Sequence, residues 1–220
     1  MARSKWSNNG GPNDLNYSSK EYMISLVLTP RPMLILTSTG PRHMAATIAP
    51  MAQSHAASFH ACLDIVARER KYLLLLQAPP LAQVERYVAD NIAQGHVQVV
   101  ALAGPTVVGW ADILPGWTET VAHVGKLGMG LLPAFRGIGL GTQLLSAAIA
   151  KAREQGISRI ELGVRIDNAA AAALYRKLGF VDEGYRRRAI KVDGKYIDEL
   201  AMALWVGDRL GDSLGDGLGD

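Results

Sequence analysis

The sequence predicts an α/β fold in which a twisted, mixed sheet of about six to seven strands is flanked by about four helices. Three observations support this prediction. Short runs alternate apolar with polar or glycine residues, as half-buried strands do. Longer segments carry apolar residues at helical spacing. One such helix lies between two strands within residues 123–164, an order that gives a parallel strand pair.

Length and composition limit the class of protein. The chain has 220 residues, enough for one domain with a sizeable core, and 49% of them are hydrophobic. Its formal net charge of +3 is too small to indicate nucleic acid as a main partner. Cys62 is the only cysteine, so no intrachain disulfide can form, and we expect it in the core rather than as a nucleophile. We therefore predict a cytoplasmic protein.

Both ends of the chain differ from its middle. Residues 7–19 are rich in Ser, Asn, Gly and Pro, and prolines split the apolar stretch over residues 22–36. That stretch is too short for a membrane helix of roughly 20 residues, so we expect no membrane contact. We predict a disordered extension over residues 1–41, leaving open an upstream start codon with Met33 or Met44 as the functional beginning.

The middle of the chain, residues 42–206, is the predicted domain. The tail over residues 207–220 repeats Leu-Gly-Asp but lacks the nonapeptide glycine pattern of calcium-binding β-rolls. We therefore predict that the tail is disordered.

The first part of the domain predicts one strand and two helices. A short strand near residues 45–51 leads into a helix over about 53–69. An apolar run follows at residues 72–76, and a second helix extends over about 81–93 and ends at Gly95.

Three further strands follow. Residues 97–102 and 106–113 are joined by a Gly-Pro turn and predict a hairpin. Residues 123–132 predict the third strand, in which Leu127, Met129 and Leu131 alternate with Gly128 and Gly130. Its glycine face has almost no side chains, so it would admit a ligand or another backbone, or else mark a bulge.

A glycine-rich stretch follows this strand and leads into an amphipathic helix beginning near Thr142. It reads Arg136-Gly137-Ile138-Gly139-Leu140-Gly141. Without Cβ atoms, successive N–H groups can turn towards one point, and a helix N-terminus there favours an anion by up to about 2 kcal/mol. The spacing fits neither the dinucleotide fingerprint nor the nucleoside-triphosphate loop. The stretch predicts a phosphate-bearing ligand, with a ligand-free helix cap as the alternative.

The helix after this loop has an apolar stripe and ends at Gly156. Residues 160–164 then alternate as a strand, so that the glycine-rich loop lies at the carboxyl end of a strand in a right-handed crossover. This is the edge at which open α/β sheets bind ligands. The stripe consists of Leu140, Leu144, Leu145, Ala148, Ile149 and Ala152.

A second motif covers residues 168–180 and reads N-A-A-A-A-A-L-Y-R-K-L-G-F. It predicts a short helix capped by Asn168 and ended by glycine. Asn168 and Tyr175 are two helical turns apart and should project on one side, while Leu174 and Leu178 should face the core.

The two motifs together, in this order, resemble those of the GNAT acetyltransferase superfamily, and the resemblance covers about residues 42–205. It implies a GNAT-like sheet and an acyltransferase that uses acetyl-coenzyme A (acetyl-CoA) as acetyl donor. By this resemblance, Asn168 would hydrogen-bond the pantetheine arm and Tyr175 would point its hydroxyl at the thioester sulfur. The implied coenzyme-binding residues are Met129, Leu131, Leu132, Arg136, Gly137, Ile138, Gly139, Leu140, Gly141, Thr142, Asn168 and Tyr175.

The resemblance also implies a mechanism, in which a neutral amine attacks the thioester directly in a ternary complex. Leu131 would offer its backbone N–H to the acetyl oxygen. Tyr175 would be the general acid for the leaving thiolate, worth typically 10²–10⁴-fold, or else would only pack against the coenzyme. These two residues are the catalytic candidates.

The general base is left open among His123, Glu161, Asp112, Glu199 and a chain of water molecules. All four side chains are near expected strand ends, and histidine has the most suitable ordinary pKa. We predict no metal, because His43, His55, His60 and His96 show no ligand spacing.

The last two strands, residues 181–190 and 196–205, are joined at Asp193-Gly194, a strong hairpin signal. The superfamily closes its acceptor site with this hairpin and with the helices over residues 53–93. We predict a small-molecule amine as acceptor. A protein N-terminal or lysine acetyltransferase, which would need an open groove, and a non-enzymatic coenzyme A sensor are the alternatives, and homodimerisation is left open.

Overall fold

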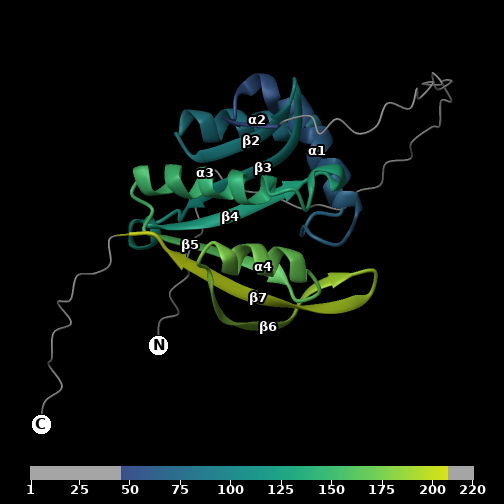
Figure 1. The fold of residues 1–220 in the computed structure, drawn as a ribbon, viewed down its shortest axis with the longest axis vertical. Coiled ribbons are helices and arrows are strands. Elements are labelled where there is room, and N and C mark those ends of the chain that lie inside the picture. Colours follow the sequence, from purple (N-terminus) through teal and green to yellow (C-terminus); the bar gives the residue numbers. More distant parts are fainter. Residues whose placement is uncertain (1–45, 208–220) are drawn as a thin grey trace, which may run out of the picture. The chain divides into compact units, whose positions relative to one another are not determined.

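The computed structural model describes residues 46–207, all of which belong to one compact unit, His43–Asp220. Within the described residues, seven strands form one sheet in the order β1-β2-β3-β4-β5-β7-β6, with four α-helices around it (Figure 1). The predicted fold class is confirmed. The predicted N-terminal extension and nearly all of the predicted tail lie outside the described residues.

The first four strands are antiparallel neighbours: β1 (Thr47–Pro50), β2 (Val97–Ala103), β3 (Thr106–Pro115) and β4 (Val124–Leu131). The short helix η1 (Gln53–His55) leads into α1 (Ala56–Arg68), and α2 (Leu81–Ala93) follows. Side chains alternate between the two faces of a strand. Accordingly, Val100 and Trp110 pack in the cluster with α1 and α2, whereas Val99 and Ala111 pack in the cluster with α3 (Leu140–Glu154).

The crossover from β4 through α3 gives a parallel pair with β5 (Arg159–Arg165), as predicted. The whole predicted stripe of α3 is buried. The pairing of β4 with β5 is short, however, because it joins only residues 124–126 to residues 159–161. Both strands continue for several residues without a mutual register. The sheet is therefore split at the carboxyl ends of β4 and β5, and we call this split the opening.

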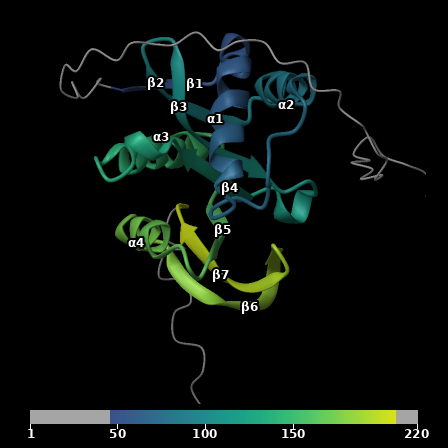
Figure 2. The same cartoon turned by 90° about the vertical axis from the view of Figure 1, so that its right-hand side faces the viewer.

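The other side of the opening is formed by β5, β7 (Lys195–Trp205) and β6 (Val181–Val192). The β6–β7 turn has φ of 50° at Asp193 and 77° at Gly194, the left-handed pair that a two-residue hairpin requires. α4 (Ala169–Lys177) packs in the same cluster as α3, and Figure 2 shows these two helices on the opposite side of the sheet from α1 and α2.

Two details of the sequence prediction are corrected. The glycine face of β4 is filled by side chains of β3, since a Cβ at Gly130 would lie 2.3 Å from the Trp110 ring and one at Gly128 would lie 2.5 Å from Asp112 Oδ1. This face therefore holds neither a ligand nor a bulge, and the β3–β4 register is continuous. On α4, Tyr175 is more deeply buried than Leu174 and Leu178, because it packs against Phe180.

The apolar run at residues 72–76 forms neither helix nor strand, and Leu74, Leu75 and Leu76 are exposed. None of the helices within the described residues is both long and apolar enough to span a bilayer.

Candidate active site

The glycine-rich loop joins the carboxyl end of β4 to the N-terminus of α3, after the short helix η3 (Pro133–Phe135). Gly137 and Gly139 have φ of 76° and 85°, the left-handed region that favours glycine. Apart from the adjoining residues, no atom of the described residues lies within 4 Å of a Cβ built at either position. The helix begins at Leu140, two residues before the predicted start, with Gly139 as its N-cap.

The N–H groups of this loop are free. Those of residues 137–142 have no acceptor among the described residues, and the first intrahelical donor is Gln143, which bonds to the Gly139 carbonyl at 3.2 Å. Free amides at the positive end of a helix are a site for an anion. The loop therefore fits a diphosphate group, whose oxygens could accept hydrogen bonds from several of these amides.

The edge of β4 that faces the opening also has free donors. Leu132 donates to the Val108 carbonyl and Gly116 donates to the Val124 carbonyl, both at 2.9 Å, so the even-numbered residues of this strand bond towards β3. The alternation of a strand then turns the N–H groups of Met129 and Leu131 towards β5. There β5 forms no ladder with them, because the pairing ends at Lys126.

Asn168 caps α4, as predicted: its Oδ1 accepts from the backbone N–H of Ala171 at 3.3 Å. The Nδ2 group of Asn168 has no acceptor among the described residues. Its side chain can therefore cap the helix through oxygen and still donate hydrogen bonds to a ligand through nitrogen.

Tyr175, on the same helix, is 8% exposed and lies against Phe180 with 5.7 Å between ring centroids. Burial raises the pKa of Tyr175 to about 12. Its hydroxyl has no hydrogen-bond partner among the described residues. At neutral pH the hydroxyl therefore carries its proton, and it can donate that proton to a more basic group.

Arg136 differs from what the sequence suggested, because its side chain is engaged by protein groups. Nη1 donates to Glu69 Oε2 at 2.8 Å and Nε donates to the Leu131 carbonyl at 2.8 Å. The guanidinium also lies over the Tyr72 ring, 4.6 Å from its centroid. The side chain thus joins the end of α1 to the end of β4. Nothing in the sequence indicated that Glu69 would be the partner of Arg136.

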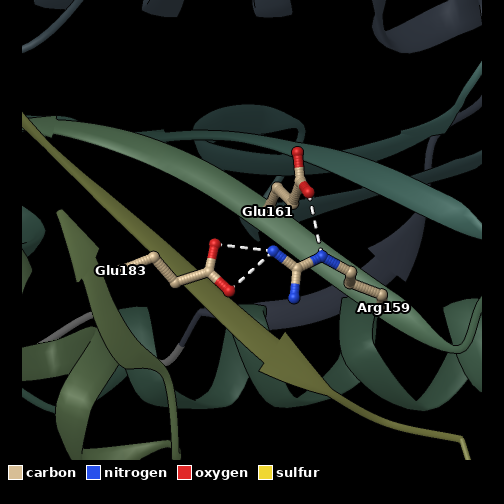
Figure 3. Close-up of polar contacts among 3 residues, drawn as sticks. All are labelled: Arg159, Glu161 and Glu183. Carbon is tan, nitrogen blue, oxygen red and sulfur yellow. Dashed lines mark hydrogen bonds and ion pairs between the residues drawn. The ribbon is translucent and has the colours of Figure 1, made fainter. Parts of the chain in front are cut away.

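Three of the four candidate bases lie at different places in the sheet. His123 is exposed at the amino end of β4, the end away from the glycine-rich loop. Glu161 lies in the last β4–β5 pair, and Arg159 binds both Glu161 and Glu183 (Figure 3). Asp112 is buried, accepts a hydrogen bond from Tyr87 at 2.9 Å, and faces the side of the sheet that α2 covers.

Glu199 is the fourth candidate, and it lies beside the opening. It is buried on β7 in register with Arg165, and its carboxylate rests against Gly163 of β5, where a Cβ would be 2.2 Å from Oε1. Its neighbours Leu200 and Met202 belong to the cluster with α3 and α4. The carboxylate therefore faces the other side of the sheet, and Arg186 donates to it at 2.8 Å.

Comparison with known proteins identifies the family. Residues 63–180 match the family model described as the acetyltransferase (GNAT) family. The chain belongs to the GNAT acetyltransferase family. The predicted superfamily, the acyltransferase class and acetyl-CoA as acetyl donor are thereby confirmed. The free amides of residues 137–142 are the feature of this chain that fits the coenzyme diphosphate.

Two relatives and one solved structure illustrate the similarity. The N-alpha-acetyltransferase RimI of Mycobacterium tuberculosis is 40% identical over 109 residues, which cover 47% of this chain and 65% of that protein. The L-methionine sulfoximine/L-methionine sulfone acetyltransferase of Pseudomonas paraeruginosa is 39% identical over 130 residues, or 56% of this chain and 73% of that protein. The solved structure of YncA from Salmonella typhimurium, with its cofactor acetyl-CoA, shares the fold with a TM-score of 0.71 and 20% identity, covering 75% of this chain and 96% of that one.

Two chemical alternatives find no support. Cys62 is buried in the cluster with α1 and α2, and burial raises the pKa of its thiol to about 12, so a nucleophilic thiolate is not favoured. Among the described residues, no group of three or more His, Cys, Asp or Glu side chains could hold a metal ion.

Proposed function

We propose that this enzyme transfers the acetyl group of acetyl-CoA to the primary amine of a small molecule, by direct attack in a ternary complex. One observation carries the proposal: the N–H groups of residues 137–142, which have no acceptor within residues 46–207, lie directly beyond the β4 edge whose N–H groups have no strand partner in that part of the chain. A diphosphate on the loop and a thioester in the opening would use both sets of donors. The proposed domain extends over residues 42–206.

The coenzyme-binding roles follow from these donors. The backbone of residues 137–142 would hold the diphosphate, and the edge of β4 at Met129, Leu131 and Leu132 would align the pantetheine arm together with Asn168 Nδ2. For Arg136 we now propose an indirect role. Its side chain would stabilise the conformation of the loop by binding Glu69 and the Leu131 carbonyl.

The catalytic roles are divided between the two sides of the opening. The N–H of Leu131 would stabilise the negative charge that develops on the acetyl oxygen. Tyr175 would give its proton to the leaving sulfur, because burial raises the pKa of its hydroxyl and keeps that proton in place at neutral pH. Glu199 would take the proton of the attacking amine, because it is the candidate carboxylate that is buried beside the opening.

A small-molecule acceptor is supported by one relative and by the structure. The Pseudomonas paraeruginosa relative is named for small amino acid derivatives. In this chain, an ion pair between Arg70 and Asp193 joins the end of α1 to the β6–β7 turn, the two parts expected to close the acceptor site. The Mycobacterium tuberculosis relative, named as an N-alpha-acetyltransferase, makes a protein N-terminus the second candidate acceptor.

Location and assembly are also proposals. A single cysteine suits a reducing compartment, so we propose the cytoplasm, and we leave open whether two copies associate.

The test is a calorimetric titration of the full chain with acetyl-CoA, with NADH as the rival ligand. Gly139→Glu should abolish binding, since it places a like charge in the loop and strains a left-handed position. Gly104→Glu is the matched control, because Gly104 has φ of 60°, equally open surroundings, and a place in the β2–β3 turn. Failure of the wild type to bind acetyl-CoA would contradict the proposal. Binding would justify screening amines by release of the coenzyme thiol.

A further inference from the structure

Two consecutive residues after α1 connect both sides of the opening. Glu69 pairs with Arg136, next to the end of β4. The Arg70 carbonyl accepts from Arg165 Nη1 at 2.9 Å, at the end of β5. The Arg70 guanidinium forms an ion pair with Asp193 in the β6–β7 turn, in which Nε lies 3.0 Å from Oδ2. We call these three contacts the strap.

The Arg70–Asp193 ion pair is the outer contact of the strap and is more exposed than the other two. The Glu69–Arg136 pair and the bond to the Arg70 carbonyl are the inner contacts. Arg165 is buried, with 8% of its side chain exposed, and it also pairs with Asp167 at 2.6 Å. The side chains of Arg70 and Asp193 are 41% and 62% exposed. An ion pair this exposed is weak and can break without unfolding the protein. The inner contacts therefore hold the segment in place, while the outer pair can open.

The backbone at Arg70 supports this view. Its φ is 57°, a left-handed conformation that is uncommon for a residue with a Cβ. Such a conformation persists only where surrounding contacts impose it. At Arg70 this conformation ends α1, where the Arg70 N–H donates to the Ala67 carbonyl at 2.9 Å, and the bond from Arg165 to the Arg70 carbonyl holds it in place.

The route of the acceptor amine leads past the outer pair. Helices α3 and α4 cover one face of the split sheet, so the amine must approach from the face on which Glu199 lies. On that face, the end of α1 and the β6–β7 turn stand at the two sides of the opening, and Arg70 and Asp193 join them.

We propose that the Arg70–Asp193 ion pair is a latch that sets the size of the acceptor. Closed, it leaves room for a small amine and excludes a polypeptide N-terminus, whose chain has to leave the site between the same two elements. Arg70 and Asp193 are then residues that determine specificity and take no part in the chemistry. The inference rests on the proposed function, because it concerns the acceptor side of that site.

The variant that tests the latch is Asp193→Asn in the full chain. Asparagine before glycine is well suited to this turn, so the change removes the charge and keeps the hairpin. Arg70→Asn is the second variant, since asparagine tolerates a left-handed conformation and retains the carbonyl that Arg165 binds. Asp182→Asn is the matched control, because it breaks an exposed ion pair of β6 with Arg176 that does not cross the opening.

Two measurements test whether the Arg70–Asp193 ion pair limits the size of the acceptor. In the first, kcat/KM is compared for free methionine and for a hexapeptide beginning with methionine. Each latch variant should raise the peptide-to-amino-acid ratio by about two- to fivefold, the range that an exposed ion pair can supply, while Asp182→Asn leaves it unchanged. An unchanged ratio in both latch variants, or no turnover of the peptide by any variant, would overturn the proposal.

The second measurement is amide hydrogen exchange over residues 69–80, which needs no acceptor. Exchange there should become about two- to fivefold faster in Asp193→Asn and not in Asp182→Asn. Equal exchange in both would also overturn the latch. If the latch variants exchange faster but neither methionine nor the peptide is acetylated by the wild type, the proposed acceptor class is wrong and the size-selecting role of the latch falls with it.

Discussion

The carboxylate of Glu69 binds the guanidinium of Arg136 through two hydrogen bonds, one of them 2.8 Å between Nη1 and Oε2. Glu69 lies at the C-terminal end of α1 and Arg136 opens the glycine-rich loop, 67 residues later. The positive charge beside the loop is thus neutralised within the protein. Attraction of an anion is left to the backbone amides and the helix end.

Glu69→Gln is expected to strengthen the binding of acetyl-CoA. The substitution removes a negative charge near the proposed diphosphate site and leaves Arg136 free to turn towards it. We expect about a two- to fivefold lower Kd at low ionic strength, and a smaller effect in high salt. Calorimetry at two salt concentrations would measure this, with Glu119→Gln at the far end of β4 as the control. A weaker affinity would mean that Glu69 acts only by holding the loop in shape.

Substitutions of Asn168 should separate helix capping from coenzyme binding. Asn168→Ala removes the cap and should cost about 1 kcal/mol of stability. Asn168→Ser keeps an oxygen that can accept from the Ala171 N–H but lacks the Nδ2 donor. Thermal unfolding should therefore distinguish the two variants, while both raise KM for acetyl-CoA. A normal KM in Asn168→Ser would assign Asn168 to the helix cap alone.

Tyr175→Phe should lower kcat and leave the affinity for acetyl-CoA nearly unchanged. The ring and its packing against Phe180 remain, and only the proton donor is lost. A general acid of this kind is typically worth 10²–10⁴-fold in rate. Single-turnover measurements of thiol release would show the loss, with the exposed Tyr185→Phe as the control. Equal rates in Tyr175→Phe and the wild type would leave Tyr175 a packing residue.

Elements that depend on local sequence could be predicted closely. The bounds of α2 agree with the predicted range, and the Asp193-Gly194 turn forms with positive φ at both residues. In each case the signal lies within the segment itself, as an apolar period or as a pair of residues suited to a left-handed turn.

Contacts between distant segments could not be predicted from the sequence. The pairing of Glu69 with Arg136 and the position of Glu199 on Gly163 depend on how β7 and the end of α1 are placed around the opening. The glycine face of β4 illustrates the limit most clearly. Alternation predicted correctly that it lacks side chains of its own, but nothing local indicated that Trp110 and Asp112 would occupy it.

Asp112 leads to the last prediction, because its environment couples folding to pH. Burial raises the pKa of Asp112 from 3.8 to about 6, against hydrogen bonds from Tyr87 and the Gly128 backbone that lower it. A carboxyl group whose pKa is higher in the folded state favours folding when protonated. Its contribution is therefore complete below about pH 4 and is lost as the pH rises to about 6, with an upper limit of roughly 3 kcal/mol.

Asp112→Asn should remove this dependence, since an amide stays neutral and its oxygen can still accept the Tyr87 hydrogen bond. We expect the variant to unfold at a higher urea concentration than the wild type at pH 7.5 and at a similar one at pH 4. The control is Asp182→Asn: Arg176 lowers the pKa of Asp182, so the contribution of that residue is present above about pH 4 and is lost as the pH falls. If urea midpoints of wild type and Asp112→Asn run parallel from pH 4 to pH 7.5, Asp112 is ionised in the folded protein without cost, and Tyr87 and Gly128 fully compensate its burial.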